Sequence, residues 1–219
     1  MNLRCTTDKY AALYARWLAN PGGLLDLAGY VPGQRLLDLC GGTGAVSLEA
    51  LRRGADPSTV MLVDLNPRCP DERIEQVAGD ADNLGVTVFG KRQPACWNSF
   101  DVIVIRQAAA YLEWDAFSLL WLRSLLKPGG KLAFNLFTKP KRSFKTYKYE
   151  GRRYIEASWF RGRTVWHLQA SPTIGWDVTR FRWLDSEKLV RRLRQFGFHV
   201  EILSDGVSER FLCTVEKDA

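Results

Sequence analysis

With 219 residues, 46% of them hydrophobic and 25% charged, and a formal net charge of +7, the chain supports one sizeable core but is short for two independent domains. Its five scattered cysteines and two histidines argue against disulfides and a metal centre, and no apolar run reaches the roughly 18 residues of a membrane span. We therefore expect a cytoplasmic protein of one domain with an insertion, with no metal and no membrane partner.

The first two thirds of the chain alternate short apolar strands with helices. Apolar residues at helical spacing between residues 9 and 27 predict an N-terminal helix and a second short helix, separated by a break at residues 20–23. Strands are then expected over residues 35–40, 59–63, 74–78, 102–105 and 131–137, and helices over residues 45–53 and 115–126. The Pro128-Gly129-Gly130 segment is expected to stop the second of these helices before the last strand. This alternation predicts an α/β fold with a parallel sheet covered on both faces.

The pattern changes after residue 148. Three β-rich runs, over residues 153–160, 164–170 and 177–183, are separated by turn residues and predict an antiparallel sheet inserted into the α/β core. A helix capped by Asp185 and ended by Gly197 follows, and then strands over residues 199–203 and 210–215. We therefore expect a core of residues 1–138 and 185–219, with residues 1–34 as a helical lid and residues 139–184 as an inserted β cap.

The positive charge gathers in and after this cap. Residues 139–194 hold fifteen Lys and Arg against five Asp and Glu, so the rest of the chain is slightly acidic. Such a local excess favours an anionic substrate or a nucleic acid, and a merely solvated face is the alternative.

A glycine loop follows the first strand of the predicted core, in the sequence Leu-Leu-Asp-Leu-Cys-Gly-Gly-Thr-Gly of residues 36–44. Glycines let the backbone pass close to a cofactor and adopt φ angles that a Cβ would forbid. The carboxylate of Asp38, at the strand end, can hold an ammonium group directly or through water. Asp64 ends the second strand twenty residues beyond Gly44, where a carboxylate can accept hydrogen bonds from both hydroxyls of a ribose.

These residues closely resemble motif I, and the acidic residue that follows it, of the class I S-adenosylmethionine-dependent methyltransferases, although Cys40 stands where the usual motif has its first glycine. Gly79-Asp80-Ala81 looks like the third motif of that family, and residues 125–131 (Leu-Leu-Lys-Pro-Gly-Gly-Lys) are very like the turn before its fifth strand. The resemblance covers residues 36–137. It implies a Rossmann-like seven-stranded methyltransferase sheet of strand order 3-2-1-4-5-7-6, here with an inserted antiparallel β cap.

The resemblance also implies the cofactor, S-adenosylmethionine (SAM), and the product S-adenosylhomocysteine (SAH). Asp38 would hold the methionyl ammonium, Asp64 the ribose and Asp80 the adenine amino group, with Leu65 and Asn66 along the adenine. The residues implied in cofactor binding are Tyr10, Asp38, Cys40, Gly41, Gly42, Gly44, Asp64, Leu65, Asn66, Asp80, Ala81, Arg106 and Gln107.

The sequence departs from this pattern at one place, and the glycine loop has one alternative interpretation. Only nine residues separate Asp64 from Ile74, fewer than the dozen or more that a helical crossover needs, so either the third crossover helix is vestigial or the third strand is misplaced. A nicotinamide-dinucleotide fingerprint is a minor alternative for the glycine loop. It would need a glycine or alanine at Ser47, and some thirty-five residues precede the first strand.

The predicted reaction is methyl transfer from SAM to a small, anionic acceptor in specialised metabolism, because a short antiparallel insertion beside a tyrosine-bearing N-terminal helix resembles small-molecule N- and O-methyltransferases. Scarce histidines and the absence of a carboxylate dyad favour nitrogen over oxygen as the acceptor atom. We expect the acceptor between residues 107–111, the N-terminal helix and the cap. The predicted catalytic residues are His167 and Tyr14, and the predicted substrate residues are Tyr111, Trp166, Arg180 and Arg182.

Other functions stay open at this point. An RNA or protein methyltransferase would use the basic cap on its substrate, and a non-catalytic partner subunit would bind SAM without transferring its methyl group. Nucleic acid is accordingly a possible partner that the sequence does not favour, and a monomer or a homodimer is expected. The cap aromatics and His167 also fit a purely structural role in hairpin packing.

Overall fold

The structure of the protein is a computed structural model that describes residues 20–84, 98–137, 142–204 and 208–216. The chain divides into two compact units. We call the unit of residues 21–136 and 186–219 the core unit, and we call residues 137–185, which belong to the other unit, the cap unit.

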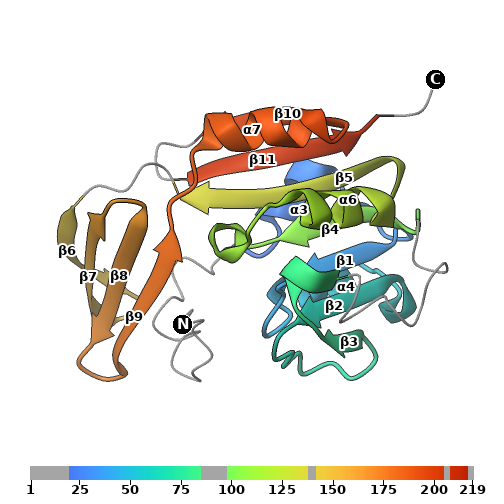
Figure 1. Cartoon of the computed structure of the whole chain (residues 1–219). Helices are drawn as coiled ribbons and strands as arrows, with labels where there is room; N and C mark the ends of the chain where they lie inside the picture. The colour runs from blue at the N-terminus through green and yellow to red at the C-terminus, as the bar shows by residue number, and fades with distance from the viewer. Residues whose placement is uncertain (1–19, 85–97, 138–141, 205–207, 217–219) are drawn as a thin grey trace. The chain divides into compact units, whose positions relative to one another are not determined.

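The core unit is built on a seven-stranded sheet. Its strands are β1 (Leu36–Leu39), β2 (Val60–Asp64), β3 (Glu75–Ala78), β4 (Phe100–Ile105), β5 (Leu126–Phe137), β10 (Phe198–Ser204) and β11 (Ser208–Val215). They follow the order β10-β11-β5-β4-β1-β2-β3 (Figure 1). The strands β1 to β5 pair in parallel with their neighbours, and β10 pairs with β11 antiparallel. This confirms the predicted order 3-2-1-4-5-7-6.

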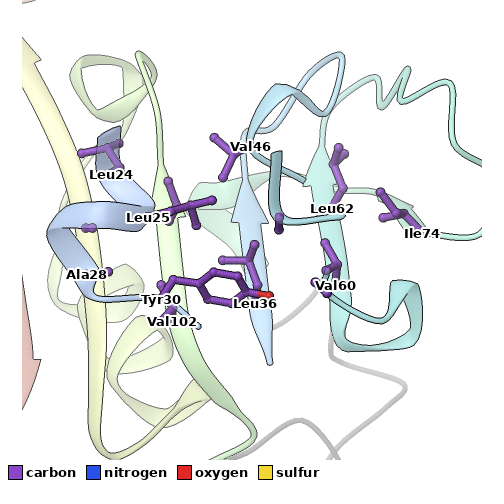
Figure 2. Packing of buried hydrophobic residues seen from close by; sticks show 14 of the residues in the cluster. Leu24, Leu25, Ala28, Tyr30, Leu36, Val46, Val60, Leu62, Ile74 and Val102 are labelled. Carbon is purple, nitrogen blue, oxygen red and sulfur yellow. The ribbon is translucent and has the colours of Figure 1, made fainter. Parts of the chain in front are cut away.

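Two helices, α3 (Gly23–Ala28) and α4 (Ala45–Arg52), pack on one face of this sheet. Figure 2 shows Leu25 of α3 and Val46 of α4 in one buried cluster with Leu36 of β1. Burying one such side chain stabilises a fold by about 1.5–3 kcal/mol. The cluster therefore anchors the start of α4 to β1 and holds the loop between them.

The opposite face of the sheet carries a stack of aromatic rings. Phe134 of β5 lies 4.6 Å from Phe211 and 4.7 Å from Trp114, measured between ring centroids. The indole nitrogen of Trp114 donates a hydrogen bond of 2.7 Å to the carbonyl of Ala109. Aromatic pairs of this kind add about 0.5–1.5 kcal/mol beyond the burial of their area. They fix the chain that follows β4.

The helices of the core unit agree with the sequence. Those expected over residues 45–53, over residues 115–126 and after Asp185 are confirmed as α4, α6 (Ala116–Leu125) and α7 (Ser186–Gln195). Gly197 follows α7 with a φ of +78°, the left-handed conformation typical of a helix end. Of the two N-terminal helices, the second is α3, and the first lies outside the described residues.

The short connection between β2 and β3 has no helix. The third strand was placed correctly, because Asp64 pairs with Ala78 in a parallel ladder. Residues 65–74 cross over as turns and loop. Gln76 braces this connection, since its side-chain oxygen accepts a hydrogen bond of 3.0 Å from the Cys69 N–H. The crossover helix is therefore missing rather than the strand misplaced.

The Pro128-Gly129-Gly130 segment is not the predicted turn between a helix and a strand. The strand β5 begins directly after α6 and contains this segment. Phe100 pairs with Leu126 and Val102 pairs with Lys131, so four residues of β5 bulge opposite one residue of β4. Proline and glycine interrupt a strand ladder as readily as they end a helix. The sequence therefore does not distinguish a turn before the strand from a bulge within it.

The cap unit holds a four-stranded antiparallel sheet of order β6-β7-β8-β9 (Figure 1). Its strands are β6 (Ser143–Tyr149), β7 (Arg152–Arg161), β8 (Thr164–Ser171) and β9 (Gly175–Arg182). The three predicted β runs are confirmed as β7, β8 and β9, and β6 was not predicted. The two faces of this sheet differ sharply in burial.

Candidate active site

The glycine loop joins β1 to α4 in a tight backbone path. Cys40, Gly42 and Gly44 all have φ angles in the left-handed region, at +61°, +54° and +74°. The Gly44 N–H donates to the Gly41 carbonyl at 2.8 Å, which closes the turn. A Cβ on Gly41 would lie 2.7 Å from the Asp38 carboxyl carbon, and a Cβ on Gly44 would lie 2.6 Å from the Cys69 sulfur. Glycine is required at both positions by space, and at Gly44 also by φ.

Asp38 is buried under this loop, with its side chain only half satisfied by the protein. It is 1% exposed, and its Oδ2 accepts hydrogen bonds from the Ser47 N–H at 3.1 Å and the Ser47 hydroxyl at 2.7 Å. No described residue donates a hydrogen bond to its Oδ1. A buried carboxylate oxygen without a partner is costly, which makes Oδ1 a candidate acceptor for a donor on a ligand.

The protonation of Asp38 follows from the same contacts. Burial raises the pKa of its carboxyl to about 6, although the two hydrogen bonds from Ser47 and the positive charge of Arg106 act to lower it. Asp64 adds a small upward effect on the same pKa through charge repulsion. Asp38 therefore changes charge within the range where an incoming cation can recruit its ionised form.

Asp64 ends β2, the strand beside β1, and ties the glycine loop to its own strand. Its Oδ2 accepts a hydrogen bond of 3.0 Å from the Gly42 N–H, and its Oδ1 accepts one of 2.9 Å from the Asn66 N–H. Each carboxylate oxygen can accept further bonds, and the side chain is only half-buried. Asp64 thus shapes the loop and still presents acceptors to a ligand.

The tips of β3 and β4 complete this edge of the sheet. Asp80, just beyond β3, caps the short helix η2 (Ala81–Asn83) by accepting from the Asp82 N–H at 3.1 Å, and Ala81 is buried. Gln107, just beyond β4, has a φ of +60° and donates its N–H to Asn135 Oδ1 at 2.8 Å. Parallel strands end at one edge of a sheet, so these segments gather with the glycine loop.

The remaining core-unit predictions lie near the same edge. Arg106 follows β4, and its charge lowers the pKa of Asp38. Tyr111 ends the short helix η3 (Ala109–Tyr111) and is half-buried. Leu65, next to Asp64, is 46% exposed and presents an apolar surface, and Asn66 is exposed. Tyr10 and Tyr14 lie outside the described residues.

The cap unit does not bring its four predicted site residues together. Trp166 and His167 are consecutive in β8, and consecutive residues of a strand point to opposite faces. Trp166 pairs across strands with Arg180, and Arg182 lies two residues further along β9, so these three share one face. His167 lies on the other face, so the predicted catalytic residue of the cap and its three predicted substrate residues are on opposite faces of the sheet.

His167 sits in a polar network on its own face. Its Nδ1 lies 2.8 Å from the Ser158 hydroxyl, and its Nε2 lies 3.4 Å from the amide nitrogen of Gln169. Gln169 also donates to the Glu156 carboxylate at 3.2 Å, and both of these residues are buried. Burial lowers the pKa of His167, which favours a neutral imidazole at neutral pH.

Two residues with a role at this site were not predicted. Ser47, in the first turn of α4, supplies both hydrogen bonds to Asp38, and Asn135 of β5 holds the backbone of Gln107. Spacing alone does not reveal the contact of Ser47 with Asp38, because it depends on how the loop returns the start of α4 to the strand end. Within the described residues, no group of three metal-ligating side chains occurs.

The fold and this edge together define a protein that binds a nucleoside cofactor at the carboxyl ends of a parallel sheet. A family model described as a methyltransferase domain matches residues 8–202. The chain therefore belongs to the class I SAM-dependent methyltransferases, the family whose cofactor is SAM. The site fits that cofactor, since it offers an unpartnered buried oxygen on Asp38 and a loop that a Cβ would block.

Similar proteins support the same family. The chain is 29% identical over 130 residues to the ubiquinone/menaquinone biosynthesis C-methyltransferase UbiE of Teredinibacter turnerae, covering 58% of this chain and 52% of the relative. It is 34% identical over 122 residues to the demethylmenaquinone methyltransferase of Renibacterium salmoninarum, covering 53% and 47%. The chain thus spans about half the length of the curated relatives it matches.

Solved structures share the fold over nearly the whole chain. The sugar N-methyltransferase KedS8 from a Streptoalloteichus species has a TM-score of 0.66 at 18% identity, covering 99% of this chain and 96% of that one. The SAM-bound amino pentose methyltransferase CalS10 from Micromonospora echinaspora also has a TM-score of 0.66, at 20% identity, covering 98% and 99%. In the described part of this chain, no helix is long and apolar enough to cross a membrane.

Proposed function

We propose that the protein transfers the methyl group of SAM to a nitrogen atom of a small acceptor molecule. The observation that carries this proposal is the buried Asp38 carboxylate, whose Oδ1 lacks a donor beside the glycine loop. An ammonium group is the donor that satisfies such an oxygen most strongly, because a charge-assisted hydrogen bond is about twice as strong as a neutral one. SAM carries that ammonium at its methionyl end.

The other proposed residues contact different parts of the cofactor. Asp64 accepts from the ribose hydroxyls while it keeps the Gly42 N–H in place. Asp80 and Ala81 address the adenine, with Leu65 as an apolar surface along it. Cys40, Gly41 and Gly44 leave the backbone open to the methionyl chain. Tyr10, Asn66, Arg106 and Gln107 complete the proposed cofactor set.

The donor supplies a methyl group on a positively charged sulfur, which is already an excellent leaving group. The protein therefore has mainly to align the acceptor atom with that group and to exclude water. Orientation of this kind contributes roughly 7–11 kcal/mol to lowering a barrier. On the acceptor side we propose Tyr111 and Tyr14, with His167 as a neutral base or orienting group.

Nitrogen is proposed as the acceptor atom because an amine needs only to arrive deprotonated. Burial lowers the pKa of His167 and makes its imidazole a weak base, so the proposal gives it an orienting role more than a proton-accepting one. The solved structures with this fold include a sugar N-methyltransferase and an amino pentose methyltransferase, which supports an amine. The relatives named as C-methyltransferases make methylation of carbon the second candidate. An anionic group on the acceptor and a role in specialised metabolism are part of the proposal.

The test is methyl transfer from labelled SAM by the purified protein. Matched small acceptors would be offered in pairs, an amino sugar and the hydroxy sugar that lacks only the amine, together with a phenolic carbon acceptor. We expect label in the amine product and release of SAH, and neither product with Asp38→Asn. Label on carbon alone would mean that the acceptor atom is carbon and not nitrogen. Binding of SAH without turnover in a full metabolite extract would support the non-catalytic alternative. Label in RNA or protein would support the other alternative.

A further inference from the structure

The exposed face of the cap sheet is apolar in the middle and basic at both ends. We call it the basic face. Cross-strand pairing fixes its members: it carries Phe144, Thr146, Lys148, Arg153, Ile155, Ala157, Trp159, Arg161, Thr164, Trp166, Leu168, Ala170, Trp176, Val178, Arg180 and Arg182. The residues between them in each strand point to the other face, which includes the buried Tyr154, Glu156 and Gln169.

Large apolar side chains stand in solvent between the two basic ends of the basic face, and they extend across all four strands. Phe144 is 72% exposed, Trp176 is 71% exposed and Trp159 is 40% exposed. Ile155 is also exposed, and the rings of Trp159 and Trp166 stack with 6.3 Å between centroids. A concentration of exposed apolar groups on one face, rather than single scattered ones, indicates an interaction surface.

Cationic side chains flank this centre. Lys148 pairs with Arg153 at one end, and Arg161, Arg180 and Arg182 lie at the other, all of them exposed. The nine residues from Arg153 to Arg161 along β7 span about 27 Å. Among the strand residues that the structure describes, none of the carboxylates lies on this face, because Glu156 and Asp177 both point to the other one.

We propose that the basic face docks on the surface of a membrane that contains anionic lipids. Tryptophan and phenylalanine side chains enter the boundary between headgroups and acyl chains, and lysine and arginine keep their charges at the headgroups beside them. Each cation near such a surface strengthens the attraction by roughly five-fold. The contact is peripheral, and it is independent of the proposed methyl transfer.

Two other occupants fit the face less well. A second copy of the chain would bring its cations against the same cations, which repel one another. A single-stranded nucleic acid would use the tryptophans as stacking platforms. It would leave Ile155, Leu168 and Val178, in the centre of the face, without a suitable partner.

The test is cosedimentation of the whole protein with vesicles, either of phosphatidylcholine alone or of equal parts phosphatidylcholine and phosphatidylglycerol. We expect binding only to the anionic vesicles, weakened by added salt, with a shift of tryptophan fluorescence to shorter wavelength. The double variant Lys148→Gln with Arg153→Gln should weaken binding by roughly ten-fold or more. Trp176→Ser should weaken it as well, by removing an apolar group from the centre.

A matched control separates the face from total charge. The double variant Arg191→Gln with Arg194→Gln removes the same charge from the exposed side of α7, in the core unit, and should bind vesicles as the unchanged protein does. Binding of SAH by every variant reports that the core unit is folded. The proposal fails if anionic vesicles are not bound, or if the two double variants lose binding equally. It also fails if Trp176→Ser dissolves a dimer, or if polyuridylic acid is bound in preference to vesicles.

Discussion

Ser47 donates two hydrogen bonds to Oδ2 of Asp38, from its N–H at 3.1 Å and from its hydroxyl at 2.7 Å, and Oδ1 of Asp38 accepts none from the described residues. This arrangement orients the carboxylate without satisfying it. Ser47 of α4 supplies the donors to Oδ2, and the proposed ammonium of the cofactor supplies the donor to Oδ1. Several measurable properties depend on that division.

Ser47→Ala should destabilise the protein by about 1.5–3 kcal/mol, because a buried carboxylate loses a hydroxyl donor. Urea denaturation measures this free energy of unfolding. Ser58→Ala is the matched control, since the Ser58 hydroxyl donates to Asp56 at 2.8 Å in an exposed turn and its loss should cost less. Equal losses in the two variants would mean that burial of Asp38 adds nothing to the bond.

The affinity for SAH should fall as the pH falls through about 6, because binding of an ammonium needs the ionised Asp38. Calorimetric titrations at a series of pH values measure this dependence. Ser47→Ala should move the midpoint upward, since the hydrogen bonds from Ser47 lower the pKa of Asp38. A flat pH profile between the usual carboxyl pKa and neutrality would contradict the account.

Asp38 should also make the protein without ligand less stable as the pH rises. Its pKa in the folded state, about 6, lies above its ordinary value of 3.8, so the folded state holds the proton more tightly. The stabilisation is fully present below about pH 4 and is lost by about pH 6, a change of about 3 kcal/mol. Urea unfolding of the protein and of Asp38→Asn measures this, because the asparagine variant lacks the titrating group. The stability of the protein relative to the variant should fall by about 3 kcal/mol between pH 4 and just above pH 6, and a difference that stays constant with pH would contradict the raised pKa.

Cys40→Gly should stabilise the protein by about 1 kcal/mol, because Cys40 holds a left-handed φ of +61° that glycine adopts without strain. Thermal and urea unfolding measure the gain. Cys40→Ala is the control, since alanine removes the thiol and keeps the strained conformation, and it should bring no gain. If alanine stabilised as much as glycine, the thiol and not the backbone would be the cause.

Asp64→Ala should lower the affinity for SAH by roughly ten-fold to a hundred-fold, because it removes the proposed ribose acceptors and the support of the Gly42 N–H. Calorimetry again gives the dissociation constant. Asp71→Ala offers a comparison in the same crossover, where Asp71 pairs with Arg73 at 2.6 Å, and its affinity should be unchanged. A similar loss in both variants would point to a general disturbance of the crossover.

Local sequence signals predicted most of the core unit. Short apolar strands, the glycine loop and the carboxylates at two strand ends are each readable over a few residues, and parallel pairing then brings them to one edge. The strand β6 was missed because it is an edge strand with exposed lysines, which resembles a loop in sequence. The contact of Ser47 with Asp38 depends on how the loop folds back, which spacing alone does not determine.

In the cap, the sequence contained a signal that the prediction of site residues did not use. Trp166 and His167 are neighbours in a strand, so their side chains had to point apart. The cap sheet therefore has two faces with different chemistry.

The most direct test of the central claim is a calorimetric titration of SAH into the protein and into Asp38→Asn at neutral pH, with unfolding curves to establish that both are folded. The account predicts one-to-one binding by the unchanged protein and a loss of at least roughly a hundred-fold in affinity for the variant. Folded protein that takes up no SAH, or a variant that binds it equally well, would contradict the assignment of the Asp38 edge as the cofactor site.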